Sequence, residues 1–190
     1  MKLIVTESLS ILLIAMFAAL LAPLVRSTTL AHLSLSQLTA SAHTVVRVQC
    51  LSNESLWREG EIWTVTSFRV LENWKGNLPP EIRVWMIGGS IGHITSYVPG
   101  APRFSPGKEA VLFLEPARDG SLSITAWGEG TFRIRRDPRT GEVSVTQDTA
   151  LKPDFDPAAR AFRAAGIREL PLAQFKSRVL AAEKSPRSPQ

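Results

Sequence analysis

The chain has 190 residues, of which 44% are hydrophobic and 21% charged; this composition indicates one globular domain with appendages and excludes a disordered chain. The formal net charge is +5 at pH 7, but no run of five basic residues occurs, so the clustered charge of a nucleic-acid-binding surface is missing. Dispersed positive charge is typical of a soluble protein with an exposed surface.

Residues 1–31 have the pattern of a secretory signal peptide. Lys2 precedes the apolar run Leu9–Ala22, which is shorter than the roughly 20 residues of a membrane span. Ser27 and Ala31 both end segments suited to signal cleavage. We favour cleavage after Ala31, and an uncleaved amino-terminal anchor is the alternative. The sequence therefore predicts a secreted or periplasmic protein with no membrane span after signal cleavage.

Cys50 is the only cysteine in the sequence, so no intrachain disulfide can form. It lies in the apolar run Val45–Leu51, where a small buried hydrophobe is a better interpretation than a reactive thiol. An exported domain of this kind must be held together by its hydrophobic core or by an intermolecular bridge.

The amino-terminal part of the domain begins with one short helix. Leu35 and Leu38 lie at helical spacing and predict a helical turn within Leu33–Ala42, with Ser34 or Ser36 as its cap. Further along the chain, apolar residues recur at every second position, which is the pattern of β-strands. The predicted strands are Thr44–Leu51, Glu61–Gly76, Glu81–Ile87, Glu109–Leu114, Ser121–Trp127, Thr131–Arg135 and Glu142–Gln147.

The longest predicted strand, Glu61–Gly76, organises the others. At about 3.3 Å per residue it would span roughly 40–50 Å, too long for a flat strand in a small domain, so we expect it to coil or to carry a bulge. The residues predicted to share one face of this strand are Ile62, Phe68, Val70 and Trp74. The residues predicted to be buried together in the core are Ile62, Phe68, Val84, Leu112 and Ile124.

The turn signal Asp119-Gly120 predicts a hairpin between the fourth and fifth strands. Five strands with a hairpin between the last two suit a closed barrel of the OB type. The predicted fold is therefore mainly β: a five-stranded OB-like closed barrel with an added carboxy-terminal hairpin and two short carboxy-terminal helices. We expect the barrel domain to occupy residues 32–148, a helical extension residues 149–184, and a disordered tail residues 185–190.

The two carboxy-terminal helices are predicted from different signals. Asp156–Ala165 opens with an aspartate cap and a proline at the first helical position. Pro171–Glu183 carries an apolar stripe, which we expect to dock on the outside of the barrel near Trp63 or Trp85. The stripe consists of Leu172, Phe175, Val179 and Leu180.

Two connecting segments carry large apolar residues that could contact a partner. Ser52–Gly60 is predicted to be a polar loop around Trp57, which either binds a partner or plugs the barrel end. Gly88–Lys108 contains five glycines and three prolines, and an irregular segment of about 20 residues is usually functional or mobile. Phe104 lies close to the next strand, so we expect it to fold back onto the barrel.

The best candidates for partner contact are the residues farthest from both ends of the second segment. Ile91, His93 and Tyr97 meet this criterion, and apolar residues on such a segment either fold back or bind a partner. Trp57 is the fourth predicted partner-binding residue.

Several short motifs occur in a characteristic order. They are Thr44-Val-Val-Arg-Val in the first strand, Trp74-Lys75-Gly76 at the end of the second, Ile82-Arg-Val-Trp in the third, Gly107-Lys-Glu before the fourth and Asp119-Gly-Ser-Leu-Ser-Ile-Thr in the last hairpin. With these motifs, Ala42–Trp127 resembles the netrin-like domain of tissue inhibitors of metalloproteinases, and also uncharacterised secreted bacterial proteins of the same plan. The resemblance covers under half of the chain.

The resemblance implies an OB-type barrel whose contact ridge would lie at Met86–His93. The inhibitors of that family also chelate the protease zinc through a mature amino-terminal cysteine, which disulfides hold in place. This sequence has neither the cysteine nor the disulfides, so the zinc-chelating wedge cannot be transferred to it. Only the position of the ridge is transferable, because a shared fold does not imply a shared function.

Residues for catalysis or metal binding do not form a convincing group. His32, His43 and His93 have no histidine or carboxylate partner at metal-ligand spacing. The glycine-rich stretch Gly88–Gly92 lacks a lysine and leads into no predicted helix, so it is no phosphate cradle. The sequence predicts no enzyme, no cofactor and no metal site.

The predicted function is an exported, non-enzymatic module that binds a protein partner, with a secreted protease as one candidate. The alternatives are a structural envelope protein and an OB barrel that binds carbohydrate or another ligand. The residues considered for the ligand-binding alternative are Trp63, Arg69, Arg83 and Trp85. Export makes nucleic acid a poor partner. The sequence determines neither the partner nor the oligomeric state.

Overall fold

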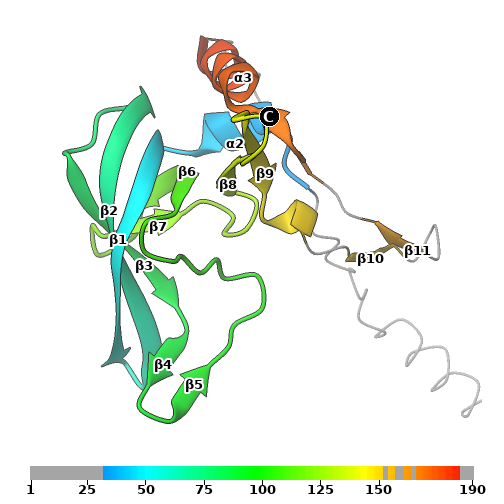
Figure 1. Ribbon diagram of the computed structural model, residues 1–190. Helices are drawn as coiled ribbons and strands as arrows, with labels where there is room; N and C mark the ends of the chain where they lie inside the picture. The colour runs from blue at the N-terminus through cyan, green and yellow to red at the C-terminus, as the bar shows by residue number, and fades with distance from the viewer. Residues whose placement is uncertain (1–31, 152–153, 157–160, 164–165, 185–190) are drawn as a thin grey trace, which may run out of the picture. The chain divides into compact units, whose positions relative to one another are not determined.

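The computed structural model describes residues 32–151, 154–156, 161–163 and 166–184 (Figure 1); the predicted signal peptide and the predicted tail lie outside this part. The described elements are, in chain order, α2 (Leu35–Ser41), β1 (Thr44–Arg58), β2 (Glu61–Lys75), β3 (Glu81–Ile87), β4 (Gly89–Ile91), β5 (Ile94–Ser96), β6 (Glu109–Pro116), β7 (Leu122–Ile124), β8 (Thr131–Arg136), β9 (Val143–Gln147), the 3-10 helix η1 (Thr149–Leu151), β10 (Asp154–Asp156), β11 (Ala161–Arg163), β12 (Leu170–Pro171) and α3 (Leu172–Lys184). The fold is mainly β, as predicted.

Five strands pair in a closed ring. The pairs run β1–β2, β2–β3, β3–β7 and β7–β6, and β6 returns to pair with β1. The β3–β7 contact is parallel and consists of one residue pair, Val84 with Leu122. β6 and β7 form the hairpin predicted at Asp119-Gly120. From β6 the sheet continues outside the ring through β8, β9 and β12, and β8–β9 is the predicted carboxy-terminal hairpin.

The pairing of β1 with β2 shifts at three points. Trp74 and Leu71 are extra residues in β2, and Leu51 is an extra residue in β1, so the predicted bulging of the long strand is confirmed. An extra residue moves the side chains beyond it to the other face of the sheet. Phe68 faces the inside of the ring, whereas Trp74 belongs to the outer core. The prediction that both share one face is therefore wrong.

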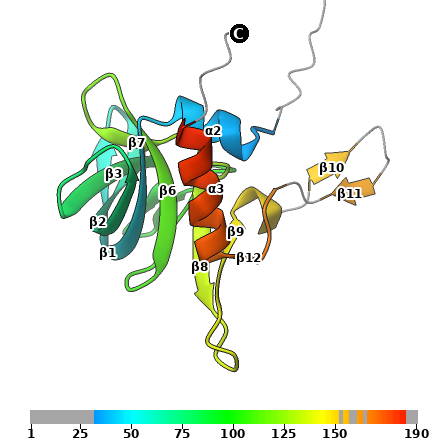
Figure 2. The ribbon, with the colours of Figure 1, turned by 90° about the horizontal axis from the view of Figure 1, so that it is seen from above.

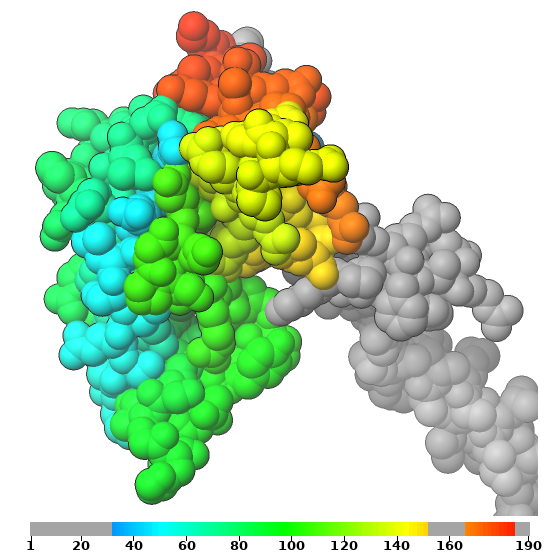
Figure 3. Space-filling model, in the orientation of Figure 1, coloured from blue at the N-terminus to red at the C-terminus, as the bar shows by residue number. Residues whose placement is uncertain are grey.

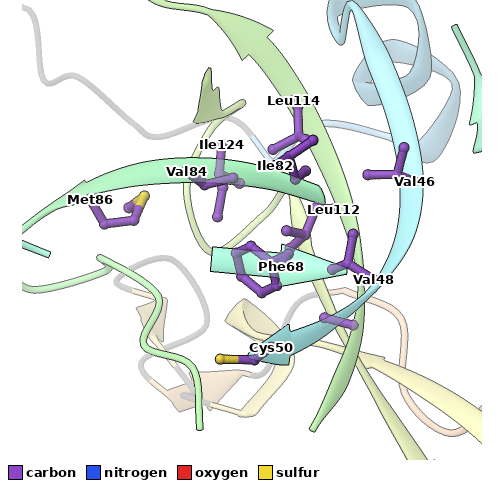
Figure 4. Packing of buried hydrophobic residues seen from close by; sticks show 11 residues of the cluster. Val46, Val48, Cys50, Phe68, Ile82, Val84, Met86, Leu112, Leu114 and Ile124 are labelled. Atoms are coloured by element: carbon purple, nitrogen blue, oxygen red, sulfur yellow. The ribbon is translucent and has the colours of Figure 1, made fainter. Parts of the chain in front are cut away.

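The inside of the ring is filled by one hydrophobic core (Figure 4). Its buried residues are Val46, Val48, Cys50, Phe68, Ile82, Val84, Met86, Ala110, Leu112, Leu114 and Ile124. Four of the five predicted core residues are among them; Ile62 is also buried but lies outside this cluster. Phe104 packs edge-to-face on Phe68, with 4.9 Å between ring centroids, so its predicted fold-back is confirmed.

A second core lies on the outer face of β6, which is buried on both sides. Val111 and Phe113 belong to this core and pack with residues of α2, α3, β8 and β9. Figure 2 shows α3 lying alongside β6, β8 and β9. The apolar stripe of α3 docks here, with Phe175 and Val179 fully buried. The stripe therefore covers Trp74 and not Trp63 or Trp85, because the bulges in β2 turn Trp74 toward the helix.

A charged network also ties α3 to β2. The Glu72 carboxylate accepts hydrogen bonds from Lys176 Nζ at 2.5 Å, from Trp74 Nε1 at 3.0 Å and from Arg47 Nη1 at 3.0 Å. Arg47 also binds Glu109, with 2.7 Å between Nη2 and Oε2. The hydrogen bond from Lys176 is the largest influence on the pKa of Glu72, and with the others it lowers that pKa to about 2.

Two further predictions are corrected. The predicted loop Ser52–Gly60 is mostly strand, because β1 continues to Arg58 and pairs with β2 as far as Glu61. Only Glu59 and Gly60, both with positive φ, form the turn. Of the helix predicted over Asp156–Ala165, the described residues are strand and not helix: Asp156 ends β10, and Ala161–Arg163 form β11, which pairs with β10 in an antiparallel ladder. Residues 157–160 and 164–165 of that prediction lie outside the described part of the chain. A short helix without an apolar stripe has little packing energy to stabilise it, and helix propensity is a weak signal by itself.

The predicted helices at Leu33–Ala42 and Pro171–Glu183 are confirmed as α2 and α3. Ser34 caps α2: its Oγ accepts from Gln37 N at 3.2 Å, and Gln37 Oε1 accepts from Ser34 N at 2.9 Å, which is a capping box. Neither α2 nor α3, the α-helices in the described part of the chain, is long and apolar enough to cross a membrane.

Candidate functional site

The described part of the chain contains histidine, cysteine and carboxylate side chains, which are the usual metal ligands in proteins. No three side chains among its His, Cys, Asp and Glu residues are grouped to hold a metal ion. Cys50 is a free, buried cysteine, as predicted, and burial raises the pKa of its thiol despite the opposing charge of Arg133. A thiol that resists ionisation is a poor nucleophile.

Gly88–Gly92 has the Gly-x-Ser-x-Gly spacing of a nucleophile elbow. Such an elbow needs a sharp turn from a strand into a helix. Ser90 instead lies in the β4–β5 hairpin, and its Oγ is 2.9 Å from Thr95 Oγ1. The local structure therefore does not fit the elbow.

The turn between β1 and β2 separates two candidate surfaces. Consecutive residues in a strand point to opposite faces. Trp57 points to the face that carries Ser55 and Thr64, and β4 packs on this face. Arg58 points to the other face, where it meets Trp63 and Trp85.

The first candidate surface, which we call the tip surface, consists of Trp57 and the residues from Ile91 to Tyr97. Trp57 is 53% exposed, Ile94 54% and Tyr97 65%. His93 is exposed at the turn between β4 and β5, and Ile91 is half-buried. In Figure 1 the β4–β5 hairpin and the β1–β2 turn lie at the same end of the described domain, and Figure 3 shows the hairpin protruding there.

Polar contacts hold the β4–β5 hairpin against β1 and β2. Thr64 Oγ1 donates to Gly88 O at 2.6 Å, and Gly88 N donates to Ile62 O at 2.7 Å. Gly89 fits because a Cβ at this position would collide with the hydroxyls of Ser55 and Thr64. The hairpin is therefore positioned mainly by its base, while Ile94, next to its turn, remains exposed.

The second candidate surface is a cleft of about 500 Å³, which we call the tryptophan cleft. The Arg58 guanidinium lies 5.9 Å from the ring centroid of Trp63 and 5.1 Å from that of Trp85, which are cation–π distances. The same guanidinium donates to Asp119 at 2.8 Å. Hydrogen bonds from Ser121 and then from Arg58 hold the pKa of Asp119 well below its usual range.

Trp127 completes the lining of the tryptophan cleft and is 42% exposed. Ala126 and Trp127 have φ values of +50° and +48°, a left-handed conformation that is unusual for a bulky residue. Backbone strain of this kind is found mainly at binding and active sites, so Trp127 is a candidate ligand contact.

The sequence interpretation found some of these residues and missed others. Trp57 lies near the end of β1, and Ile91, His93 and Tyr97 lie in or directly beside the β4–β5 hairpin, so all four belong to the tip surface; Trp63 and Trp85 both line the tryptophan cleft. Arg69 and Arg83, also considered for ligand binding, are exposed and do not line this cleft. Arg58 and Trp127 were missed. The only local signal for Arg58 was the Glu-Gly turn that follows it, and nothing local indicated Trp127.

The amino-acid sequence matches no protein-family model and no curated protein. The resemblance to the netrin-like domain therefore stays a hypothesis, and the function must be inferred from the two surfaces.

Proposed function

We propose that the protein is an exported, non-enzymatic binding module, that its ring of five strands is an OB-type barrel, and that the tip surface binds a protein partner. The observation that carries this proposal is the exposure of three large apolar side chains: Trp57 near the end of β1, Ile94 in β5 and Tyr97 directly after β5, beside a hairpin whose base is held by hydrogen bonds. Exposed apolar patches on soluble domains commonly mark interaction sites. Aromatic residues are also the most frequent anchors in protein interfaces.

The class of partner follows from where the tip surface lies. β4 falls within Met86–His93, the ridge that would contact a protease if the netrin-like resemblance holds. A secreted protease is therefore our first candidate. Without the cysteine wedge, this contact would depend on apolar packing, and binding would not require the protease metal.

The experiment compares the exported wild-type protein with the triple variant Ile91→Ser, His93→Ser, Tyr97→Ser. Proteins captured from the secretome by the wild type are identified, purified and titrated against both proteins. We expect the triple variant to bind at least about tenfold more weakly, equivalent to about 1.4 kcal/mol. Its melting temperature should stay close to that of the wild type, because its side chains are largely outside the cores.

The matched control is the double variant Leu71→Ser, Leu151→Ser, which also removes exposed apolar side chains (39% and 44% exposed) but away from the tip surface. It should bind like the wild type. Equal binding by the triple variant and this control would refute the tip surface as the binding site. A large loss of stability in the triple variant would show that the hairpin belongs to the core.

A second candidate function is carbohydrate binding in the tryptophan cleft. The specific observation in its favour is the convergence of Trp63, Trp85 and Trp127 beside the Arg58–Asp119 ion pair. An indole ring offers an apolar face for a sugar ring, and charged groups beside it can bind hydroxyls. Titration with soluble glycans separates the two functions: Trp127→Ala should abolish glycan binding and leave protein capture unchanged.

A further inference from the structure

Glu129 is a nearly buried carboxylate that neither proposed binding surface uses. The residue is 8% exposed and lies in the turn that follows β7. Its Oε2 accepts a hydrogen bond from Leu33 N at 2.9 Å, and its Oε1 lies 2.9 Å from His32 Nδ1. The carboxylate therefore contacts the first two residues of the described domain.

The position of Glu129 is set by the fold and not by the segment it binds. Its backbone N donates to Ala126 O at 3.0 Å, and its backbone O accepts from Gln147 Nε2, in β9, at 2.8 Å. The turn is thus anchored to the outer sheet independently of residues 32 and 33.

A nearly buried carboxylate is costly unless a positive charge accompanies it. Among the described residues, the ion pair of Glu129 is with His32, whose side chain is 47% exposed. Solvent weakens an ion pair in which one partner is half exposed. Glu129 therefore lies in a position that suits an additional positive group near His32.

We propose that Glu129 is the receptor for the amino terminus of the mature protein, and that this terminus is the ammonium group of His32. The inference rests on the proposed export. In the processing step, an export-associated peptidase adds water across the Ala31–His32 peptide bond. The C–N bond breaks, Ala31 keeps a carboxylate, and the freed nitrogen of His32 takes up a proton to become an ammonium.

Covalent geometry keeps this new charge within about 7 Å of the carboxylate. Backbone bond lengths keep the His32 nitrogen within about 4 Å of the Leu33 nitrogen. Leu33 N is itself 2.9 Å from Glu129 Oε2. Signal cleavage requires small residues at the first and third positions before the cleaved bond. Ala31 and Thr29 occupy these positions.

The alternative cleavage site, after Ser27, lacks this match. It would make Thr28 the first residue and leave the segment 28–31 between the ammonium and His32. The contacts of Glu129 thus favour cleavage after Ala31. The resulting ion pair would secure the residues that lead directly into α2.

The first test is the amino-terminal sequence and intact mass of the exported wild-type chain, produced with residues 1–31 in place. We expect a start at His32. A start at Thr28, or an intact chain, overturns the inference. Cleavage at another bond with normal export would leave the proposed function standing, whereas a chain retained in the cytoplasm would refute the proposed export as well.

The second test measures the ion pair in the exported protein. An amine-specific reagent should label the α-amine of the wild type severalfold more slowly than that of Glu129→Gln, read from the mass of the amino-terminal peptide. Glu129→Gln should also lower the melting temperature. Glu142→Gln, a change at an exposed carboxylate, should alter neither value.

Equal labelling and equal melting temperatures for Glu129→Gln and Glu142→Gln would overturn the inference even if the chain starts at His32. If Glu129→Gln does not fold, Glu129→Asp replaces it. This variant keeps the charge but shortens its reach, and we expect labelling between that of the wild type and that of a free α-amine. Labelling as slow as in the wild type would count against the contact.

Discussion

Replacing Phe175 with alanine tests whether α3 is part of the domain core. Phe175 is fully buried, and its ring lies 4.5 Å from that of Phe132 and 6.0 Å from that of Trp74. Truncating a buried phenylalanine to alanine usually costs about 3–5 kcal/mol, part of which comes from lost ring pairs. Since small domains have a total stability of about 5–15 kcal/mol, this loss is a large fraction of it.

The assay is urea denaturation followed by tryptophan fluorescence and far-ultraviolet circular dichroism. We expect the midpoint to fall while the slope stays constant, because the same surface is exposed on unfolding. For a chain of this length the same loss lowers the melting temperature by about 6–20 °C.

Gln174→Ala is the matched control, because Gln174 is an exposed neighbour on the same helix. A surface change of this kind should stay within about 0.5 kcal/mol of the wild type. If Phe175→Ala unfolds at the same midpoint as Gln174→Ala, α3 does not contribute to the core, and the proposed packing against Phe132 is refuted.

Three other predictions concern the ring, the charged network and the hairpin. Phe68→Ala should cost about 3–5 kcal/mol in chemical denaturation, while Leu71→Ala, at a partly exposed bulge, should cost far less; equal losses would contradict the core assignment. Glu72→Gln should lower the melting temperature near neutral pH. Because the pKa of Glu72 falls from 4.5 to about 2 on folding, the stabilisation is complete above the unfolded value, and the difference from wild type should vanish as the pH falls toward 2. Gly89→Ala should displace the hairpin and reduce partner binding with little loss of ring stability, whereas Gly92→Ala, where a Cβ meets no neighbour and only the φ of +58° is strained, should affect binding less.

Alternation along the chain was sufficient to predict most of the inner core. Val84 is buried inside the ring as predicted, and Ile82 and Met86 share its face, because a strand without bulges keeps a strict period of two. The same rule failed for Trp74, because the extra residue Leu71 lies between Phe68 and Trp74 and changes the phase of the alternation, and nothing in the local sequence marks it. The destination of the α3 stripe was mispredicted for this reason.

The two candidate surfaces could be predicted from the sequence only where their residues are close together along the chain. The glycines and apolar residues of Gly88–Lys108 marked the tip surface without knowledge of the fold. The tryptophan cleft could not be predicted as a unit, because Arg58 and Asp119 are 61 positions apart and meet only when the ring closes. The strained conformation of Trp127 likewise exists only in the folded turn.

The sequence by itself determined the local properties of this protein: the strand periodicity, the caps of α2, the hairpin turn at Asp119-Gly120 and the absence of an intrachain disulfide. These depend on neighbouring residues and on covalent chemistry. The tertiary structure decided the closure of five strands into a ring, the bulges that turn Trp74 outward, the docking of α3 and the meeting of Glu129 with His32. All of these depend on pairing and packing between distant segments. The register in which such segments pair is set by the apolar surface that the whole chain buries, and not by any one stretch of it.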